Sequence, residues 1–135
     1  MKIGFLFPGQ GAQYVGMGKD LYEKYDEAKK IYDIAEKITN EPIKQISFEG
    51  PKELLDKTKY TQLAILTQSL AILEILKKCN INSNLSAGLS LGEYTALIEN
   101  GIFSFEDGLK IVQKRGEIMQ NYTPSGNWKM LSLIH

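Results

Sequence analysis

The spacing of apolar residues changes several times along the chain, and each change predicts a separate structural element. Lys2–Phe7 is a short apolar run interrupted by Pro8-Gly9, which predicts a buried strand. Residues 26–38 repeat apolar side chains at helical spacing, with charged side chains between them, and predict a helix that ends before Pro42. A shorter helix is expected just before it, near Lys19–Tyr25.

The longest apolar stretch is Thr61–Cys79, where apolar side chains cover most of the circumference of a helix. A helix that is apolar nearly all round is usually buried in the protein core. Gln62, Gln68 and Glu74 interrupt the stretch too often for a membrane span. The pattern therefore predicts a central core helix.

The remainder of the chain alternates between strand-like and helical segments. The expected elements are strands at Leu85–Leu89 and from Lys129 to Ile134, and helices at Pro51–Asp56, at Leu91–Asn100 and from Ser104 to about Tyr122. Ser104 and Asp107 resemble a capping box at the start of the last helix. Strands that alternate with helices predict an α/β fold with a parallel sheet.

Composition narrows the possible classes of protein. A chain of 135 residues with 43% hydrophobic and 24% charged residues suits one ordinary globular domain. The 16 basic and 16 acidic residues cancel, so bulk charge indicates neither nucleic-acid nor membrane binding. The first residues lack the long apolar stretch of a signal peptide, so none is expected, and no run of about 18 apolar residues occurs. The single cysteine, Cys79, fits a reducing compartment. We expect a cytoplasmic protein without a metal site.

Gly88-Leu89-Ser90-Leu91-Gly92 has the Gly-x-Ser-x-Gly pattern of a nucleophile elbow, with a predicted strand before it and a predicted helix after it. In such an elbow the glycines leave room for close packing of strand and helix. The helix N-terminus then supplies free N–H groups that can stabilise an oxyanion. Ser90 is therefore a candidate nucleophile. The competing interpretation is a glycine-rich turn with a helix-capping serine.

Four segments in this order resemble the signature blocks of the malonyl-CoA:acyl-carrier-protein transacylase family, and also those of the acyltransferase domains of fatty-acid and polyketide synthases. The segments are FPGQGAQ, YTQLAILTQSLA, AGLSLGEYTAL and QKRGEIMQ. Together they are distributed over nearly the whole chain, from residue 7 to residue 120. The resemblance implies an α/β-hydrolase-like parallel sheet flanked by helices.

The resemblance also implies a role for particular residues. Ser90 would be the acylated nucleophile, and the backbone N–H groups of Gln10 and Leu91 would form the oxyanion hole. Arg115 would bind the free carboxylate of malonate through its two-pronged guanidinium. Gln62 would line the acyl pocket, while Glu93 and Tyr94 would support the elbow helix and do no chemistry.

The implied reaction transfers a malonyl group from coenzyme A to the phosphopantetheine thiol of acyl carrier protein, for fatty-acid or polyketide synthesis. The substrates are malonyl-CoA and phosphopantetheinylated acyl carrier protein, which is also the expected partner. No permanently bound cofactor is implied.

Some positions depart from the family pattern. Leu89 replaces the usual histidine before the nucleophile, and Leu63 replaces a usual proline. The family supplies its catalytic histidine well beyond residue 135, and His135 does not match that position. We therefore expect residues 1–122 to be the N-terminal portion of the acyltransferase core and residues 123–135 to begin a small inserted α+β subdomain. The chain would then be an incomplete member with little or no turnover of its own.

Two other functions remain open at this point. A generic serine hydrolase of the α/β-hydrolase type would share the elbow but use water as the acceptor. A non-catalytic fragment, either one that binds acyl carrier protein or a partner chain or an inert one, would retain the ancestry and lack the activity.

Overall fold

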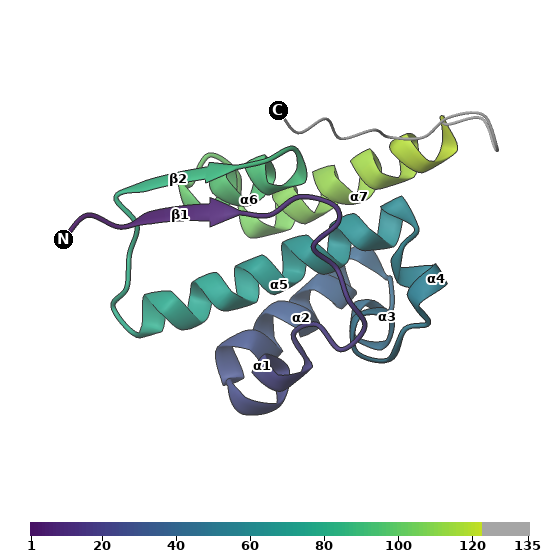
Figure 1. Ribbon diagram of the computed structural model, residues 1–135, viewed down its shortest axis with the longest axis horizontal. Coiled ribbons are helices and arrows are strands. Elements are labelled where there is room, and N and C mark those ends of the chain that lie inside the picture. Colours follow the sequence, from purple (N-terminus) through teal and green to yellow (C-terminus); the bar gives the residue numbers. More distant parts are fainter. Residues whose placement is uncertain (123–135) are drawn as a thin grey trace.

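The computed structural model describes residues 1–122 as a small parallel sheet flanked by helices, which confirms the predicted α/β class (Figure 1). The elements in chain order are β1 (Gly4–Phe7), α1 (Lys19–Lys24), α2 (Asp26–Thr39), α3 (Ile43–Glu49), α4 (Lys52–Leu55), α5 (Thr58–Lys78), β2 (Leu85–Gly88), α6 (Leu91–Glu99) and α7 (Phe105–Asn121). No helix within the described residues is both long and apolar enough to cross a membrane. The predicted strand from Lys129 and the proposed subdomain at 123–135 lie outside the described residues.

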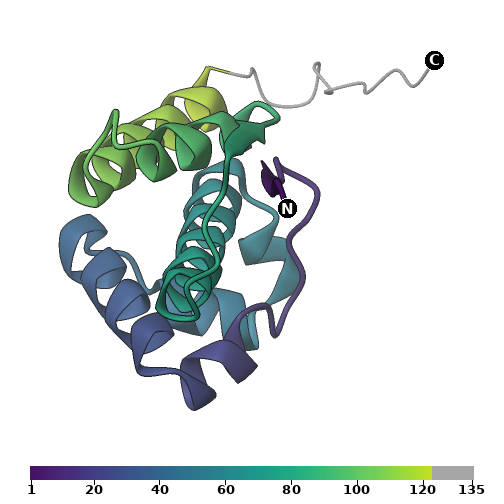
Figure 2. The ribbon, with the colours of Figure 1, turned by 90° about the vertical axis from the view of Figure 1, so that its left-hand side faces the viewer.

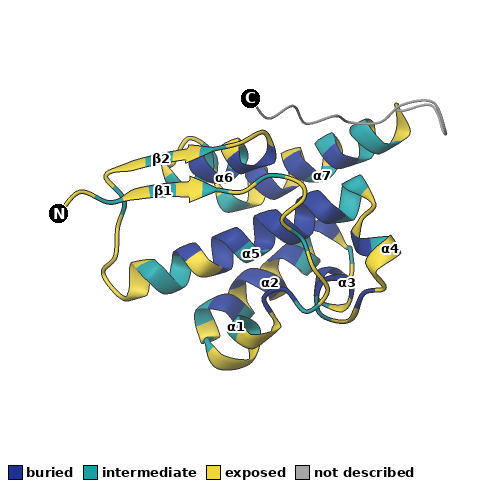
Figure 3. Ribbon diagram, viewed as in Figure 1, coloured by how far each residue is buried: buried dark blue, intermediate teal, exposed yellow. Residues whose placement is uncertain are grey.

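The sheet places the two strands in parallel, with Gly4 opposite Leu85 and Phe7 opposite Gly88. Side chains alternate between the two faces of a strand. Phe5 and Phe7 accordingly pack against the core, while Leu6 is 83% exposed on the other face. Helix α6 packs against both strands. Exposed and half-buried residues alternate along both strands, yellow and teal in Figure 3, so one face of the sheet is more open than the other.

Helix α5 is the centre of the core. It packs against α2, α3, α6 and α7, and Figure 2 shows these helices arranged around it. Its buried side chains are spread around the helix, as the sequence predicted, although the helix begins at Thr58 and not at Thr61. At α7, Ser104 caps the helix as predicted, because its Oγ accepts a hydrogen bond from the Asp107 N–H at 3.0 Å. The two long helices therefore form where the periodicity placed them.

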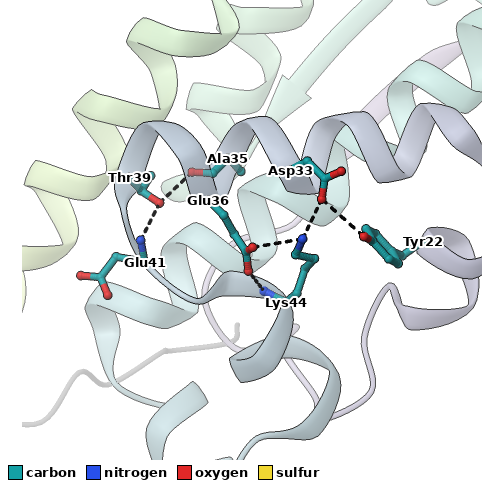
Figure 4. A network of polar contacts seen from close by, with 7 residues as sticks. All are labelled: Tyr22, Asp33, Ala35, Glu36, Thr39, Glu41 and Lys44. Carbon is teal, nitrogen blue, oxygen red and sulfur yellow. Dashed lines mark hydrogen bonds and ion pairs between the residues drawn. The ribbon is translucent and has the colours of Figure 1, made fainter.

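Helix α3 is the element that the sequence pattern did not reveal. Its buried residues, Ile43, Ile46 and Ser47, line one face of only seven residues, too short a segment for a clear helical period. Lys44 joins this helix to α2: its Nζ lies 2.6 Å from Asp33 Oδ1 and 3.1 Å from Glu36 Oε2 (Figure 4). The Lys44 N–H also donates to Glu36 Oε1 at 2.8 Å. The helix is therefore stabilised by contacts with a neighbouring helix.

The chain reverses direction between these two helices through a short polar turn. Thr39 Oγ1 donates to the Ala35 carbonyl at 2.7 Å and accepts from the Glu41 N–H at 3.3 Å (Figure 4). Asn40 ends α2 in the left-handed conformation, at φ 54°. Asparagine adopts this conformation more readily than most residues, so it suits this helix end.

We expect Lys44→Met to lower the free energy of unfolding by about 1 kcal/mol, because two partly exposed ion pairs are lost. Hydrogen bonding to Asp33, followed by that to Glu36, raises the pKa of Lys44 although partial burial opposes it. A raised folded-state pKa means that this contribution is complete below the pKa of an unfolded lysine, about 10.4, and is lost as the pH rises through the higher folded-state value. Urea unfolding at neutral and strongly alkaline pH measures the difference.

The exposed Lys110 of α7 provides the matched control for this experiment. Lys110→Met should change the unfolding free energy little at either pH. Equal effects of the two substitutions at neutral pH would show that the Lys44 ion pairs do not hold α3 in place.

Candidate active site

Ser90 occupies a strained turn between β2 and α6. The strand ends at Gly88 and the helix begins at Leu91, with Ser90 as its N-cap residue at φ 52° and ψ −102°. A non-glycine residue in such a region costs about 1–3 kcal/mol, and the surrounding structure must hold it there. Strain of this kind concentrates at functional sites. The backbone at Ser90 is therefore that of the predicted elbow.

The two glycines of the motif allow the helix to approach both strands closely. A Cβ atom on Gly88 would lie 2.0 Å from the carbonyl group of Gly92. A Cβ atom on Gly92 would lie 2.1 Å from the Phe7 carbonyl oxygen in β1. In both cases the obstructing atoms belong to the backbone and cannot rotate away. The spacing of the motif thus follows from close packing of α6 onto the ends of β1 and β2.

The Ser90 hydroxyl is not used to cap the helix, because its side chain makes no capping hydrogen bond. Its Oγ instead accepts a hydrogen bond from Arg115 Nη2 at 2.9 Å. Ser90 is also exposed. Ser90 therefore occupies the N-cap position without capping the helix through its side chain, and its oxygen faces a cationic group.

Three helices bring the predicted side chains together. Arg115 from α7 donates through Nη1 to Gln62 Oε1 of α5 at 2.7 Å, and through Nη2 to Ser90 at the start of α6. Gln62 is fully buried. Residues 62, 90 and 115 are far apart in the sequence, yet their side chains form one connected hydrogen-bonded set.

Two further residues, Met119 and Tyr94, contact this set, and the sequence did not predict these contacts. Gln62 Nε2 donates to the Met119 sulfur at 3.2 Å, and the Arg115 guanidinium carbon lies 5.4 Å from the centre of the Tyr94 ring. The helical period offered a signal for both. Met119 is four residues after Arg115, and Tyr94 is four residues after Ser90, so each shares a helix face with a predicted site residue.

The loop after β1 lies against the elbow, as the predicted oxyanion hole requires. A Cβ atom on Gly9 would lie 2.8 Å from the Leu89 carbonyl oxygen, and the Leu89 N–H donates to the Phe7 carbonyl at 3.3 Å. Gln10 follows this contact directly, and its side chain donates to Thr58 Oγ1 at 3.4 Å. Leu91 is the first residue of α6, where an N–H has no acceptor within the helix. The segments that carry both proposed amides are thus adjacent.

Further contacts tie the same loop to the helical body. The Gly11 N–H donates to Gln13 Oε1 at 2.8 Å, and Gln13 Nε2 donates to Asp56 Oδ1 at 2.9 Å. Lys52 and then Gln13 hydrogen-bond to Asp56 and lower the pKa of that carboxyl. The backbone around Gln10 is therefore anchored at the end of α4.

The arrangement can stabilise negative charge beside a serine oxygen. It combines an exposed hydroxyl, a helix N-terminus and a guanidinium within hydrogen-bonding distance of that hydroxyl. Among residues 1–122, no three acidic, cysteine or histidine side chains gather closely enough to hold a metal ion. The single histidine, His135, lies outside the described residues.

Comparison with known sequences gives the context of this site. The acyl transferase domain family matches residues 4–135. Malonyl CoA-acyl carrier protein transacylases of Bacillus subtilis (strain 168) and Staphylococcus aureus (strain MRSA252) are 44% and 42% identical to this chain over 133 residues, which is 98% of the chain. The aligned region is 42% of each relative, so the chain spans about two fifths of the length of the curated relatives it matches.

Solved structures of malonyl transacylases also match this chain. A malonyl CoA-acyl carrier protein transacylase from Clostridium perfringens (ATCC 13124) matches with a TM-score of 0.88 and 47% identity, over 93% of this chain and 40% of that chain. One chain of another solved structure matches with a TM-score of 0.88 and 34% identity, over 93% of this chain and 41% of that chain. That structure is described as a type II polyketide-synthase acyl-carrier protein in complex with its malonyl-transacylase.

Proposed function

This chain belongs to the acyl transferase domain family, and from that membership we propose that it carries the nucleophile and the acyl-binding arm of a malonyl-CoA:acyl-carrier-protein transacylase. The observation that carries the proposal is the 2.9 Å contact between Arg115 Nη2 and Ser90 Oγ. It puts a group suited to carboxylate binding beside the group suited to acylation. A malonyl thioester presents both functions, a carboxylate and a reactive carbonyl, separated by one methylene.

The first half of the reaction acylates Ser90. Its oxygen attacks the thioester carbonyl carbon, the carbon–sulfur bond to coenzyme A breaks, and the proton lost by the serine ends on the departing coenzyme A thiol. The N–H groups of Gln10 and Leu91 stabilise the negative charge that develops on the carbonyl oxygen. Arg115 binds the free carboxylate and orients the acyl group, and Gln62 holds the guanidinium from its buried side.

The second half returns the serine to its free state. The phosphopantetheine thiol of acyl carrier protein attacks the ester carbonyl, the bond to Ser90 oxygen breaks, and that oxygen recovers a proton. One structural relative is itself described as bound to an acyl-carrier protein, which supports this choice of acceptor. The product is malonyl-acyl carrier protein for fatty-acid or polyketide synthesis.

The direct test is to detect the acyl-enzyme. The chain is incubated with malonyl-CoA long enough for a slow reaction to accumulate product, and peptide mass spectrometry then locates the malonyl group. We expect an ester on Ser90 that phosphopantetheinylated acyl carrier protein removes with formation of malonyl-acyl carrier protein. Removal by water alone, with acyl carrier protein left unmodified, would indicate a serine hydrolase. Absence of any Ser90 ester would contradict the proposal.

Replacement of Arg115 tests the substrate class. Arg115→Ala should slow malonylation of Ser90 about 10- to 100-fold, because a charge-assisted bidentate contact of about 1.5–3 kcal/mol is lost. Acetylation from acetyl-CoA should change far less, because acetate offers no second carboxylate. The rates are compared for the two thioesters under identical conditions.

Lys114 provides the matched control, since it is an exposed neighbour on α7 that pairs with Glu117 at 3.5 Å. Lys114→Ala should leave both rates unchanged. If Arg115→Ala slowed the two thioesters equally, Arg115 would have no role in carboxylate binding.

A further inference from the structure

The Arg115 guanidinium has an unusual set of partners for a half-buried cation. Within residues 1–122, no carboxylate lies within ion-pairing distance of it. Its described contacts are the neutral Gln62 amide, the neutral Ser90 hydroxyl and the face of the Tyr94 ring. Its positive charge is therefore held in place by these residues and not neutralised by them.

We infer that Tyr94 is a positioning residue that keeps the Arg115 guanidinium directed at Ser90, and so makes the site selective for acyl groups that end in a carboxylate. The inference rests on the proposed function. The ring centre lies 5.4 Å from the guanidinium carbon, within the range of about 6 Å for a cation–π contact. Tyr94 also packs against the hydrophobic core, which restricts the ring.

The position of Tyr94 on α6 links it to the nucleophile. It follows Ser90 by four residues, so its ring stands on the face of the helix below the elbow. Arg115 reaches this place from α7, across the contact between the two helices. The guanidinium is therefore enclosed between Gln62 on one element and the Ser90–Tyr94 face of another.

The Tyr94 ring contacts the Arg115 guanidinium in a different way from Gln62 and Ser90. A carboxylate binds to guanidinium N–H groups, and Gln62 and Ser90 each already accept a hydrogen bond from one of the five that the ion carries. The ring uses the face of the guanidinium and none of its N–H groups. It can therefore hold the cation both before and after a carboxylate binds. A carboxylate in place of Tyr94 would neutralise the cation and compete with the substrate.

Restraint of the guanidinium by Tyr94 matters because the two reactive groups of a malonyl thioester are close together. Its carboxylate is only one methylene from the thioester carbonyl, so the guanidinium must remain close to the Ser90 oxygen during attack. Loss of orientation of this kind weakens catalysis even when every reacting group is present.

The experiment compares Tyr94→Phe, which keeps the aromatic face, with Tyr94→Leu and Tyr94→Met, which remove it. For malonylation of Ser90, we expect Leu and Met to raise the half-saturating concentration of malonyl-CoA about 5-fold. The half-saturating concentration of acetyl-CoA should change less than about 2-fold, because an acetyl group has no carboxylate for Arg115 to bind, and Phe should stay within about 2-fold of the parent for both thioesters. Thermal unfolding identifies any variant that does not fold.

A second measurement needs no reaction. Nitrogen-15 NMR of the Arg115 side chain reports rotation of its guanidinium in the ligand-free protein, which should be faster in the Leu and Met variants than in the parent and the Phe variant. If the parent forms no Ser90 ester, the proposed function fails while this measurement still tests Tyr94. Unchanged rotation in the Leu and Met variants would overturn the inference. Equal losses with malonyl-CoA and acetyl-CoA would also overturn it, because they would indicate general damage to the elbow.

Discussion

Ser90→Ala is expected to abolish formation of the malonyl ester and all transfer to acyl carrier protein. The substitution removes the only atom that forms the bond to the acyl group, while the neighbouring donors remain. Loss of a serine nucleophile in hydrolases lowers turnover by up to about 10⁶-fold, and what remains comes from the oxyanion donors and substrate binding. Intact-protein mass spectrometry after incubation with malonyl-CoA should show no mass increase.

Ser86 provides a matched control in the adjoining strand. Its Oγ accepts a hydrogen bond from Asn100 Nδ2 at 2.5 Å and lies outside the set formed by Arg115. Ser86→Ala should therefore retain acylation of Ser90.

Because alanine meets the same backbone strain at position 90, Ser90→Ala should leave the unfolding free energy within about 0.5 kcal/mol. A malonyl group that persisted in Ser90→Ala would place the nucleophile elsewhere.

Gly92→Ala is expected to lower both stability and acylation strongly. Its new Cβ would lie 2.1 Å from the Phe7 oxygen and 2.9 Å from the Pro8 oxygen, both of them backbone atoms. Helix α6 must then move away from β1, at a cost of about 3 kcal/mol. Because the elbow moves with α6, Ser90 shifts relative to Arg115, and a displacement of about 1 Å can slow a reaction about 100-fold. Urea unfolding and the malonylation rate measure the two effects.

Gly108→Ala separates this steric effect from helix propensity. Gly108 lies in α7, and its Cβ would meet the end of the Ile98 side chain at 2.3 Å, an atom that can rotate away. The gain in helix propensity of about 1 kcal/mol offsets part of that adjustment, so a small net change is expected. If the two alanine variants were equally stable, close approach of α6 to β1 would not be the reason for the glycine at position 92.

Local patterns were sufficient for most of the elements. Lys2–Phe7 and Leu85–Leu89 were recognisable as strands because each is a short apolar run that leads into a glycine-containing turn. The structure confirms both as strands, β1 and β2, with ends that differ by one or two residues, but the expected burial of the first strand is wrong, because each residue of β1 is exposed or half-buried. The capping serine of α7 was recognisable because N-capping depends on residues within one turn.

Helix α3 shows where such patterns fail. The seven residues of α3 lie between two prolines and have no intrinsic tendency strong enough to predict a helix, since short helices are marginal without tertiary contacts. Its stability comes from burial of Ile43 and Ile46 and from the Lys44 ion pairs to α2. These partners are recognised only when the two helices are seen side by side.

The candidate site divides in the same way. The Gly-x-Ser-x-Gly pattern and the family resemblance together indicated Ser90, Arg115 and Gln62, because the chemistry of each residue type is local to its motif. Neither indicated that Arg115 contacts Ser90 and Gln62 directly, or that Tyr94 and Met119 complete the set. These contacts depend on how α5, α6 and α7 pack against one another. The whole core decides how these helices pack, together with the close approach of α6 to the strands that Gly88 and Gly92 permit. The sequence therefore determined which chemical groups are present, and the tertiary structure decided which of these groups contact one another.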